Sequence, residues 1–261
     1  MSVLDIDHMI DDDTIFIEKW LQDNCIINGT YSINDDGIVD VDGDVILSDK
    51  VTSIDIQFGT VSKSFSCARC KYLKSLEGSP ESCMVFSCSF CTELISLKGC
   101  PKQVKKTLNV NHCHNITSLD EIGTAPTYVL DGCSNLSSLK GLPYNVTNLF
   151  CDHCTSLTSL EGCSNRITGA LDISYTGIKN FKHGPKYVNC LRCRHCDKLE
   201  SLVGFPIDIS IVYLEACAKL RSLQCLTYPQ DRLYIREINI PDSEISYIRK
   251  HMIGEFIYLP C

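Results

Sequence analysis

A sequence repeat of 20 to 22 residues constrains the fold of this chain more than any other feature. Three copies are plain: FSCARCKYLKSLEGSP at 65–80, FSCSFCTELISLKGCP at 86–101 and LFCDHCTSLTSLEGCS at 149–164. Weaker copies begin at Val45, Leu108, Tyr128, Leu171, Leu191, Val212 and Leu233. A unit this short cannot bury its apolar side chains alone, so neighbouring copies must stack to form a core. We therefore predict a repeat solenoid over residues 45–240.

Cysteine pairs recur within the repeat, which suggests zinc or thiol redox chemistry at first sight. The chain has 18 cysteines, and C-x-x-C pairs lie at 67/70, 88/91, 151/154 and 193/196. In the other copies the position of the first cysteine, which we call the inner column, holds Val110, Leu130, Ile173, Leu214 and Ile235. An aliphatic side chain cannot replace a metal ligand, but it can replace a free cysteine in a core. The inner column is therefore predicted to be structural.

The position of the second cysteine, which we call the ladder column, keeps its cysteine in most copies. It holds Cys70, Cys91, Cys113, Cys133, Cys154, Thr176, Cys196, Cys217 and Ile238. We predict a row of buried side chains at the strand ends, each meeting backbone groups of a turn. Cys67, Cys70, Cys88 and Cys91 lie in adjacent copies, about 4.8 Å apart if these are neighbouring strands, and form the alternative zinc set. We expect no metal and no cofactor, because both columns point into a packed core and the ladder column continues without pairing.

The repeat, L-x-C-x-x-C-x-x-L-x-S-L-x-G-x-P, resembles the leucine-rich repeat over roughly 45–240. It is most similar to the short repeats of bacterial effector proteins, which large phages and giant viruses also encode. The repeat is too short for a long helix in each copy, so we expect a convex return limb that is extended or 3₁₀, set by the glycine and proline of the repeat. The resemblance implies one short parallel strand per copy on a concave face. It also implies a protein-binding module directed at a host protein. The ubiquitin-ligase domain that can follow such repeats is not expected, since about 20 residues follow the last copy.

The two ends are predicted to cap the solenoid, over 1–44 and 241–261. A helix is expected over 13–25, followed by a hairpin around Asp35-Asp36-Gly37. The helix residues expected to face the core are Ile15, Phe16, Trp20 and Leu21. Near the C-terminus, Ser243 is predicted to cap a short helix that Gly254 ends. The segment DVDGD at 40–44 is expected to be a turn, since an EF-hand loop needs glycine at its sixth position and Gly43 is fourth.

Charge is unevenly distributed along the chain. Residues 1–56 carry a formal charge of −12 and residues 57–261 one of +4, which sum to −8. The absence of a strongly basic domain argues against nucleic acid as a partner. The first residues show no signal peptide, and no apolar run is long enough to cross a membrane. We expect a cytoplasmic protein with reduced thiols, no membrane contact, and a monomeric or weakly oligomeric state.

Tyrosine, arginine and histidine recur at strand positions that should face outward, and such residues dominate interface energies. The candidate partner-binding residues are Phe90, His112, Phe150, Asp152, His153, Tyr175, Arg192, Arg194, His195, Tyr213, Tyr234 and Arg236. An ordinary solvated sheet face is the alternative interpretation.

Catalysis is not expected at this surface. His112, His153 and His195 share one column but lie two copies apart, or roughly 10 Å, which is too far for one acid–base pair. Cys154 follows His153 directly and should point to the opposite face. We therefore expect a non-catalytic module that binds a protein partner. The alternatives are a metal- or redox-responsive protein that uses the thiol columns, and an enzyme with an unrecognised site.

Overall fold

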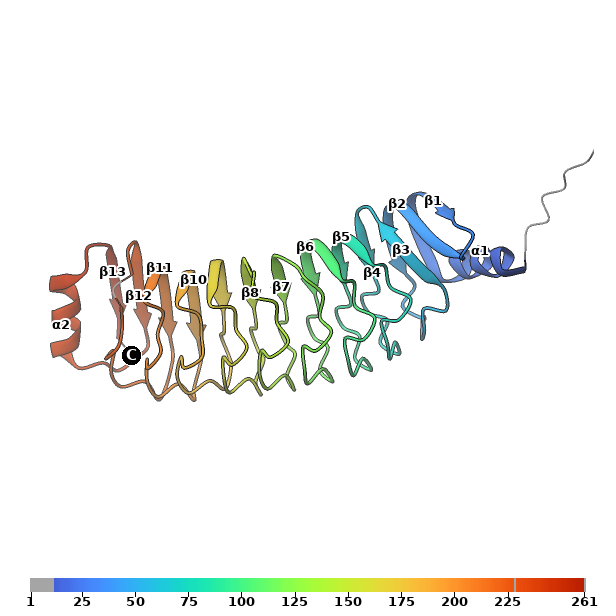
Figure 1. Cartoon of the computed structure of the whole chain (residues 1–261). Helices are drawn as coiled ribbons and strands as arrows, with labels where there is room; N and C mark the ends of the chain where they lie inside the picture. Colours follow the sequence, from blue (N-terminus) through green and yellow to red (C-terminus); the bar gives the residue numbers. More distant parts are fainter. Residues whose placement is uncertain (1–11, 228, 261) are drawn as a thin grey trace, which may run out of the picture.

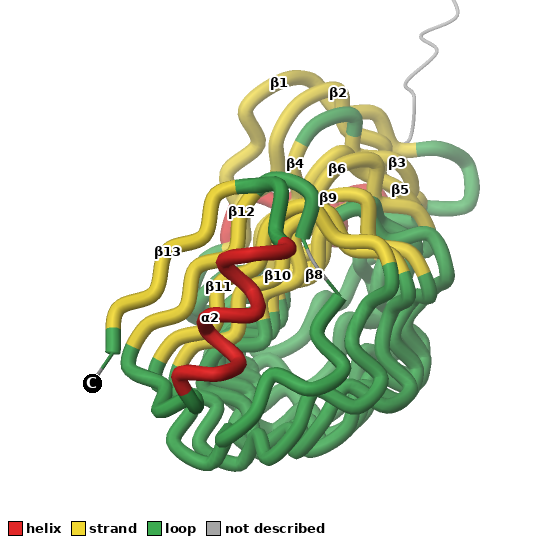
Figure 2. The backbone as a smooth tube through the Cα atoms, turned by 90° about the vertical axis from the view of Figure 1, so that its left-hand side faces the viewer, coloured by secondary structure: helices red, strands yellow, loops and turns green. Residues whose placement is uncertain are grey.

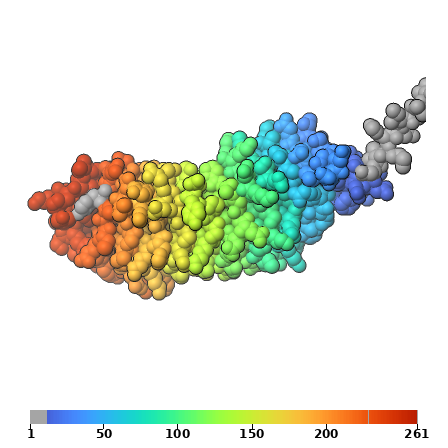
Figure 3. Space-filling view, in the orientation of Figure 1, coloured from blue at the N-terminus to red at the C-terminus, as the bar shows by residue number. Residues whose placement is uncertain are grey.

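The computed structural model describes residues 12–227 and 229–260, which form an elongated parallel β-solenoid of about 11 turns (Figure 1). The elements are α1 Asp12–Asn24, β1 Cys25–Ile33, β2 Ile38–Leu47, β3 Gln57–Val61, β4 Ser64–Ser66, β5 Ser82–Ser87, β6 Gln103–Asn109, β7 Thr127–Val129, β8 Asn148–Phe150, β9 Arg166–Asp172, β10 Tyr187–Arg194, β11 Asp208–Glu215, β12 Arg232–Arg236, α2 Asp242–His251 and β13 Glu255–Leu259. In the space-filling view, colour bands follow one another in chain order, as expected when each repeat contacts only its neighbours (Figure 3).

One sheet runs the length of the molecule. Its strand order follows the chain, except that β4 lies beside this path and pairs with β2 and β5. All pairs are parallel except β1 with β2. The residues that begin the copies are partners in register: Val45, Phe65, Phe86, Leu108, Tyr128, Leu149, Leu171, Leu191, Val212 and Leu233. The predicted repeat and its start positions are therefore confirmed, including the degenerate copy at Val45.

The core lies between the sheet and the return limbs. Both cysteine columns are buried there, together with two leucines of most copies, such as Leu73 and Leu76. Viewed from the end, strands occupy one side of the coil and loops the other (Figure 2). Among the described residues from 48 to 240 the connections contain turns and bends. No long helix occurs there, as expected, and the 3₁₀ form that the sequence allowed does not occur in these connections either.

The N-terminal helix packs with a different face from the one expected. Trp20 and Leu21 are buried as predicted, and Trp20 meets Phe58 edge-on with ring centroids 6.4 Å apart. The prediction was wrong for Ile15 and Phe16, which are about half exposed, while Ile17 is buried instead. Residues three and four apart share one face of a helix, so Ile17 belongs with Trp20 and Leu21. Neither α1 nor α2 is long and apolar enough to span a bilayer, and no other helix lies in the described part of the chain.

The predicted hairpin is present, but it is longer than expected. Ile33 pairs with Val39 across a turn in which the Asn34 side chain accepts hydrogen bonds from the backbone N–H groups of Asp36 and Ile38. β2 then continues through residue 44, so the predicted boundary between 44 and 45 falls inside a strand.

The predicted turn at 40–44 is wrong, because this segment is part of β2. β1 pairs with it on one side, and β3 and β4 pair with it on the other. The carboxylates take part in this pairing: Asp40 accepts from the backbone N–H of Thr60, Asp42 from the Ser62 hydroxyl, and Asp44 from the Ser64 hydroxyl. Backbone bonding on both sides outweighs the turn preference of Asp and Gly.

The C-terminal segment contains a helix and a further strand. Pro241 occupies the N-cap position of α2, no side chain caps the helix, and Ser243 lies inside it, so the predicted Ser243 cap is wrong. The helix ends at His251, before Gly254. β13 then adds a parallel strand beside β12 that the sequence did not predict, with Phe256 opposite Leu233. In Figure 2, α2 crosses the end of the coil.

Candidate functional site

The residue directly before each ladder position has an unusual backbone conformation, and we call this set the ring column. Its φ values lie between 50° and 71° in Arg69, Phe90, His112, Gly132, His153, Tyr175, His195, Ala216 and Glu237. This left-handed conformation costs a residue other than glycine roughly 1–2 kcal/mol. In each case the backbone N–H donates to a carbonyl of the next copy, as from Tyr175 to Arg194 at 2.7 Å. These bonds between copies hold the strained backbone in place.

Side chains of the ring column stack along the solenoid in two groups. The first joins Phe90 to His112, with ring centroids 4.5 Å apart. The second joins His153 to Tyr175 at 4.1 Å and Tyr175 to His195 at 4.7 Å. Gly132 separates the two groups, and a Cβ at that position would lie 2.5 Å from Nδ1 of His112. The second group thus presents three exposed rings in one continuous stack.

Beyond this stack, toward the C-terminal end, the surface is basic and aromatic. The carboxylate of Glu215 lies between two arginines, 3.6 Å from Nε of Arg194 and 3.2 Å from Nη1 of Arg236. The Arg194 guanidinium lies 5.9 Å from the ring centroid of Tyr213. Tyr213 in turn contacts Tyr234, with centroids 5.8 Å apart. Glu215 therefore holds both arginines in fixed positions on the outer side of the sheet.

Three aspartates from successive copies lie alongside the N-terminal part of the stack: Asp131 in the copy before it, Asp152 in the copy of His153 and Asp172 in the copy of Tyr175. Oδ1 of Asp131 accepts from the backbone N–H of Asp152 at 2.8 Å, and Oδ2 of Asp152 lies 2.9 Å from Nδ1 of His153. Asp172 accepts from the Ser174 hydroxyl at 2.6 Å. Burial raises the pKa of Asp131, and the charges of Asp152 and Asp172 add to the effect. Acidic groups thus lie beside the first two rings of the stack, and basic groups lie beside the third ring and in the copies that follow.

The structure places all twelve predicted partner-binding residues at least partly on the surface. The exposed ones are Phe90, His153, Tyr175, Arg194, His195 and Arg236, and the half-buried ones are His112, Phe150, Asp152, Arg192, Tyr213 and Tyr234. Ten of them come from consecutive copies at β8–β12, while Phe90 and His112 form the separate first group. We call the ten the partner face.

The sequence interpretation omitted Glu215 and Asp131 from the site. Both occupy the same position of the repeat as Arg194, two residues before the ladder position. Alignment of the copies at that position could therefore have identified them as part of the same surface. The prediction that His153 and Cys154 point apart is confirmed: His153 is exposed, whereas Cys154 is buried and its thiol donates to the carbonyl of Leu130 at 3.1 Å.

The ladder cysteines have a common structural role. Each thiol donates to the backbone carbonyl of the inner-column position in the preceding copy, at 3.0–3.5 Å, in Cys91, Cys113, Cys133, Cys154, Cys196 and Cys217. Cys70 donates in the same way to Ser48. All cysteines within the described residues are free thiols. Burial raises the pKa of Cys70, Cys83 and Cys100 to about 12, so these thiols stay protonated near neutral pH.

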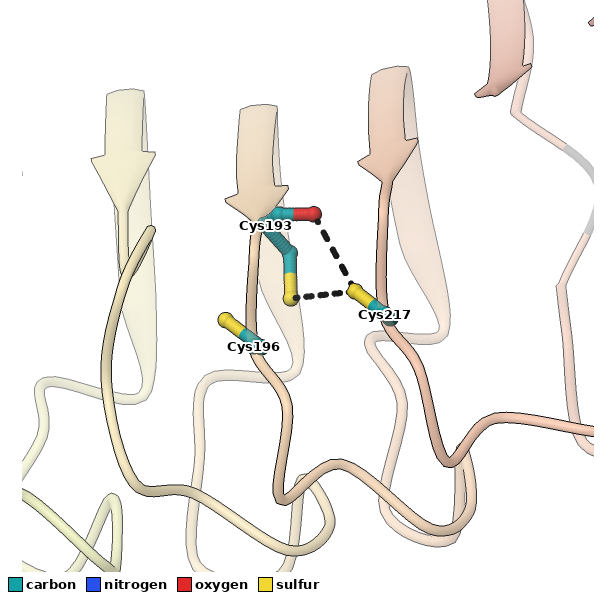
Figure 4. A group of neighbouring side chains, drawn as sticks. All are labelled: Cys193, Cys196 and Cys217. Atoms are coloured by element: carbon teal, nitrogen blue, oxygen red, sulfur yellow. Dashed lines mark hydrogen bonds between the residues drawn. The ribbon is translucent and has the colours of Figure 1, made fainter. Parts of the chain in front are cut away.

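Three thiols converge near the C-terminal end of the sheet (Figure 4). The sulfurs of Cys193, Cys196 and Cys217 lie within 4.8 Å of one another, and those of Cys193 and Cys217 are 4.0 Å apart. Over the residues that the structure describes, no other group of three histidine, cysteine or acidic side chains comes this close. Cys67, Cys70, Cys88 and Cys91, the alternative zinc set of the sequence, therefore do not gather in this way.

Comparison of the chain with models of protein families, with curated proteins and with solved structures finds no match.

Proposed function

We propose that the partner face binds the surface of another protein and carries out no catalysis. The observation that carries this proposal is the exposed stack of His153, Tyr175 and His195. Its three rings stand at left-handed backbone positions that would favour glycine, and glycine occupies only one of the nine positions of the ring column. Because all nine positions have this backbone conformation, what sets the site apart is that three successive copies carry a ring there. The rings are also held before any partner arrives, which lowers the entropic cost of binding.

The charges around the stack favour a protein surface over nucleic acid. Asp152 and Asp172 lie in the copies of His153 and Tyr175, whereas Arg192 and Arg194 lie in the copy of His195 and Arg236 lies two copies further toward the C-terminus, with Asp172 and Arg192 as direct partners across neighbouring strands. A face with both signs selects a complementary protein surface, whereas a nucleic-acid site is dominated by basic groups. Tyrosine and arginine are also the residues most enriched among those that carry interface energy.

The proposal includes the leucine-rich-repeat type inferred from the sequence, with the partner face on its concave side. Support comes from the buried leucine pairs, for example Leu94 with Leu97 and Leu136 with Leu139, at the same positions of successive copies. We further propose a reducing cytoplasmic setting, a monomeric or weakly oligomeric chain and a host protein as partner, in keeping with effector-like and viral repeats. The free state of the described cysteines accords with a reducing setting.

The test is a pull-down with the full chain as bait, followed by titration of the captured protein. A Tyr175→Ala, Arg194→Ala double variant should weaken binding by on the order of 2–4 kcal/mol, the usual range for central interface residues. Neither side chain enters the core, so circular dichroism should stay close to that of the wild type. Loss of the two ring contacts of Tyr175 should lower the free energy of unfolding by about 0.5–1.5 kcal/mol each, and the variant should remain folded under the conditions of the titration.

A matched control removes one tyrosine and one cation elsewhere. Lys71 and Tyr72 form such a pair, with the ammonium 5.7 Å from the ring centroid, and Tyr72 is 56% exposed. The Lys71→Ala, Tyr72→Ala variant should bind the captured protein as tightly as the wild type. Equal affinity of the wild type and the Tyr175→Ala, Arg194→Ala variant would instead place binding on another surface.

A further inference from the structure

We propose that Cys193, Cys196 and Cys217 form a binding site for one soft, thiophilic metal ion, monovalent copper. The three sulfurs lie within 4.8 Å of one another in the core, and Cys193 and Cys217 are already 4.0 Å apart (Figure 4). An ion held by three sulfurs in a plane at about 2.3 Å requires sulfur–sulfur separations of about 4.0 Å. Small side-chain rotations would therefore complete the site.

The position of the Cys193 sulfur distinguishes this copy from the other C-x-x-C copies. The Cys67 thiol donates to the carbonyl of Ser87 at 3.5 Å, and the Cys88 thiol donates to that of Asn109 at 3.7 Å. The Cys193 sulfur faces Cys217 instead. In the remaining copy, Cys151 and Cys154 are followed by Thr176 in the ladder column, so the third sulfur is missing. Only the 193/196/217 set thus combines three thiols with convergent sulfurs among the described residues.

The surroundings favour copper(I) over zinc. Structural zinc sites take four ligands, whereas this cluster offers three side-chain ligands. The oxygens nearest to its sulfurs are backbone carbonyls that accept the thiol hydrogen bonds, such as that of Ile173 at 3.0 Å from the Cys196 sulfur, and the Thr176 hydroxyl lies 3.7 Å from the same sulfur. All three cysteines have no exposed surface, so solvent water does not reach the site as a fourth ligand. Thiolate ligands select soft ions such as Cu(I), which is stable with three sulfurs.

Binding changes the protonation of the site in a defined way. Three S–H bonds break, three S–Cu bonds form, and three protons leave to solvent while copper stays monovalent. Three thiolates and one Cu⁺ carry a net charge of −2. Arg192 and Arg194 alternate with Cys193 along β10 and lie on the outer side of the same strand. Glu215 pairs with Arg194, so Arg192 is the cation of this strand that offsets part of the negative charge.

The experiment uses the full chain, reduced, freed of metal and kept anaerobic. Cu(I) is delivered from a competing chelator, and X-ray absorption counts the sulfur neighbours. We expect one tightly bound Cu(I) with three sulfurs, and weaker binding of Zn(II). Cys217→Thr reproduces the arrangement at Thr176 and should weaken Cu(I) binding by at least on the order of 100-fold, since even loss of an outer-shell group costs 10–100-fold.

Cys133→Thr is the matched control. Cys133 makes the same thiol-to-carbonyl bond in the ladder column, but its inner-column neighbours are Val110 and Leu130, so it lies outside the cluster. This variant should bind Cu(I) as the wild type does. Equal affinity of wild type and Cys217→Thr, or fewer than three sulfurs around copper, would overturn the proposal, and tighter four-coordinate zinc would overturn the choice of ion.

A measurement on the wild type alone covers the case in which Cys217→Thr does not fold. The chain is treated with a maleimide in mild denaturant with and without Cu(I), and the modified cysteines are identified by mass spectrometry. Copper should slow modification of Cys193, Cys196 and Cys217 at least tenfold more than that of Cys133 and Cys154. Uniform protection of all ladder cysteines would count against a site at this cluster.

Discussion

The rings of His153 and Tyr175 stack with centroids 4.1 Å apart and planes inclined by only 11°, although the residues belong to different copies of the repeat. Each residue is held at positive φ, and its backbone N–H donates to the following copy. Side-chain stacking and backbone bonding thus act along the same direction, from one copy to the next. This arrangement couples neighbouring turns of the solenoid at the surface as well as in the core.

The stacking should be measurable as an interaction energy. In a double-mutant cycle of His153→Ala, Tyr175→Ala and the double variant, we expect a coupling of about 0.5–1.5 kcal/mol in the free energy of unfolding, the range for aromatic pairs. Denaturant titrations of the four proteins provide the measurement. Additive single effects would show that the stack contributes nothing to stability.

Ala216 offers a test of the backbone strain, because it has φ of 50° and no ring that stacks. Ala216→Gly should stabilise the fold by about 0.5–1 kcal/mol, since relief of left-handed strain outweighs the greater chain entropy of unfolded glycine. The urea unfolding midpoint is the readout. The reverse change at a glycine of the same column, Gly132→Ala, should destabilise, because the new Cβ would approach Nδ1 of His112 to 2.5 Å.

The ladder thiols should be replaceable by a hydroxyl. Cys133 is buried and its thiol donates to the carbonyl of Val110 at 3.2 Å. Cys133→Ser keeps a donor at this position, whereas Cys133→Ala loses both the donor and the packed sulfur. We expect the Ala variant to be less stable than the Ser variant by about 1 kcal/mol, the typical value of one hydrogen bond. Equal stability of the two variants would show that the thiol acts by packing alone.

Alkaline pH should destabilise the protein. Burial raises the pKa of Cys83 and Cys100 from 9.0 to about 12 in the folded state. Between these values the unfolded chain has lost protons that the folded chain keeps, so the free energy of unfolding falls as pH rises from about 9 to about 12. Each such thiol contributes about 1 kcal/mol per pH unit. Cys83→Ala should reduce the number of protons released on unfolding between pH 9 and 12 by about one, and so make the free energy of unfolding fall less steeply with pH. An unchanged dependence on pH would contradict the raised pKa of Cys83.

The N-terminal segment should be needed for solubility. Removing residues 1–44 deletes α1, β1 and most of β2, including the residues that pair with β3, so it exposes the edge of β3 and uncovers Phe58 beside Trp20. An uncovered end of a solenoid and open strand edges favour aggregation. We expect the 45–261 fragment to be insoluble or to unfold without cooperativity. A soluble fragment with a sharp unfolding transition would show that this segment is not a cap.

Periodic features of this fold could be predicted from the sequence. Aligning the copies located the start residues from Val45 to Leu233 and both cysteine columns, because each repeat position occurs once in every copy and its residues can be compared. Where cysteine in one copy is replaced by Val or Ile in another, the position is expected to be buried, and both columns are buried in the structure. Exposure of residues within the strands followed from alternation with buried neighbours, as for Arg192 between Leu191 and Cys193 and for Tyr213 between Val212 and Leu214. A role of these residues in partner binding stays a prediction.

Features that occur once, or that depend on torsion angles, were decided only by the tertiary structure. Histidine, tyrosine and phenylalanine carry no signal for positive φ, and it is the bonds between copies that impose it on the ring column. Which face of α1 is buried depends on the residues that pack against it at the N-terminal end of the solenoid. The formation of strand β13 likewise depends on its pairing with β12 at the C-terminal end. Three thiols converge at Cys193 because its sulfur faces Cys217, whereas the thiols of Cys67 and Cys88 donate to a backbone carbonyl of the next copy. This difference is one of side-chain rotation, and the repeated C-x-x-C pattern does not encode it.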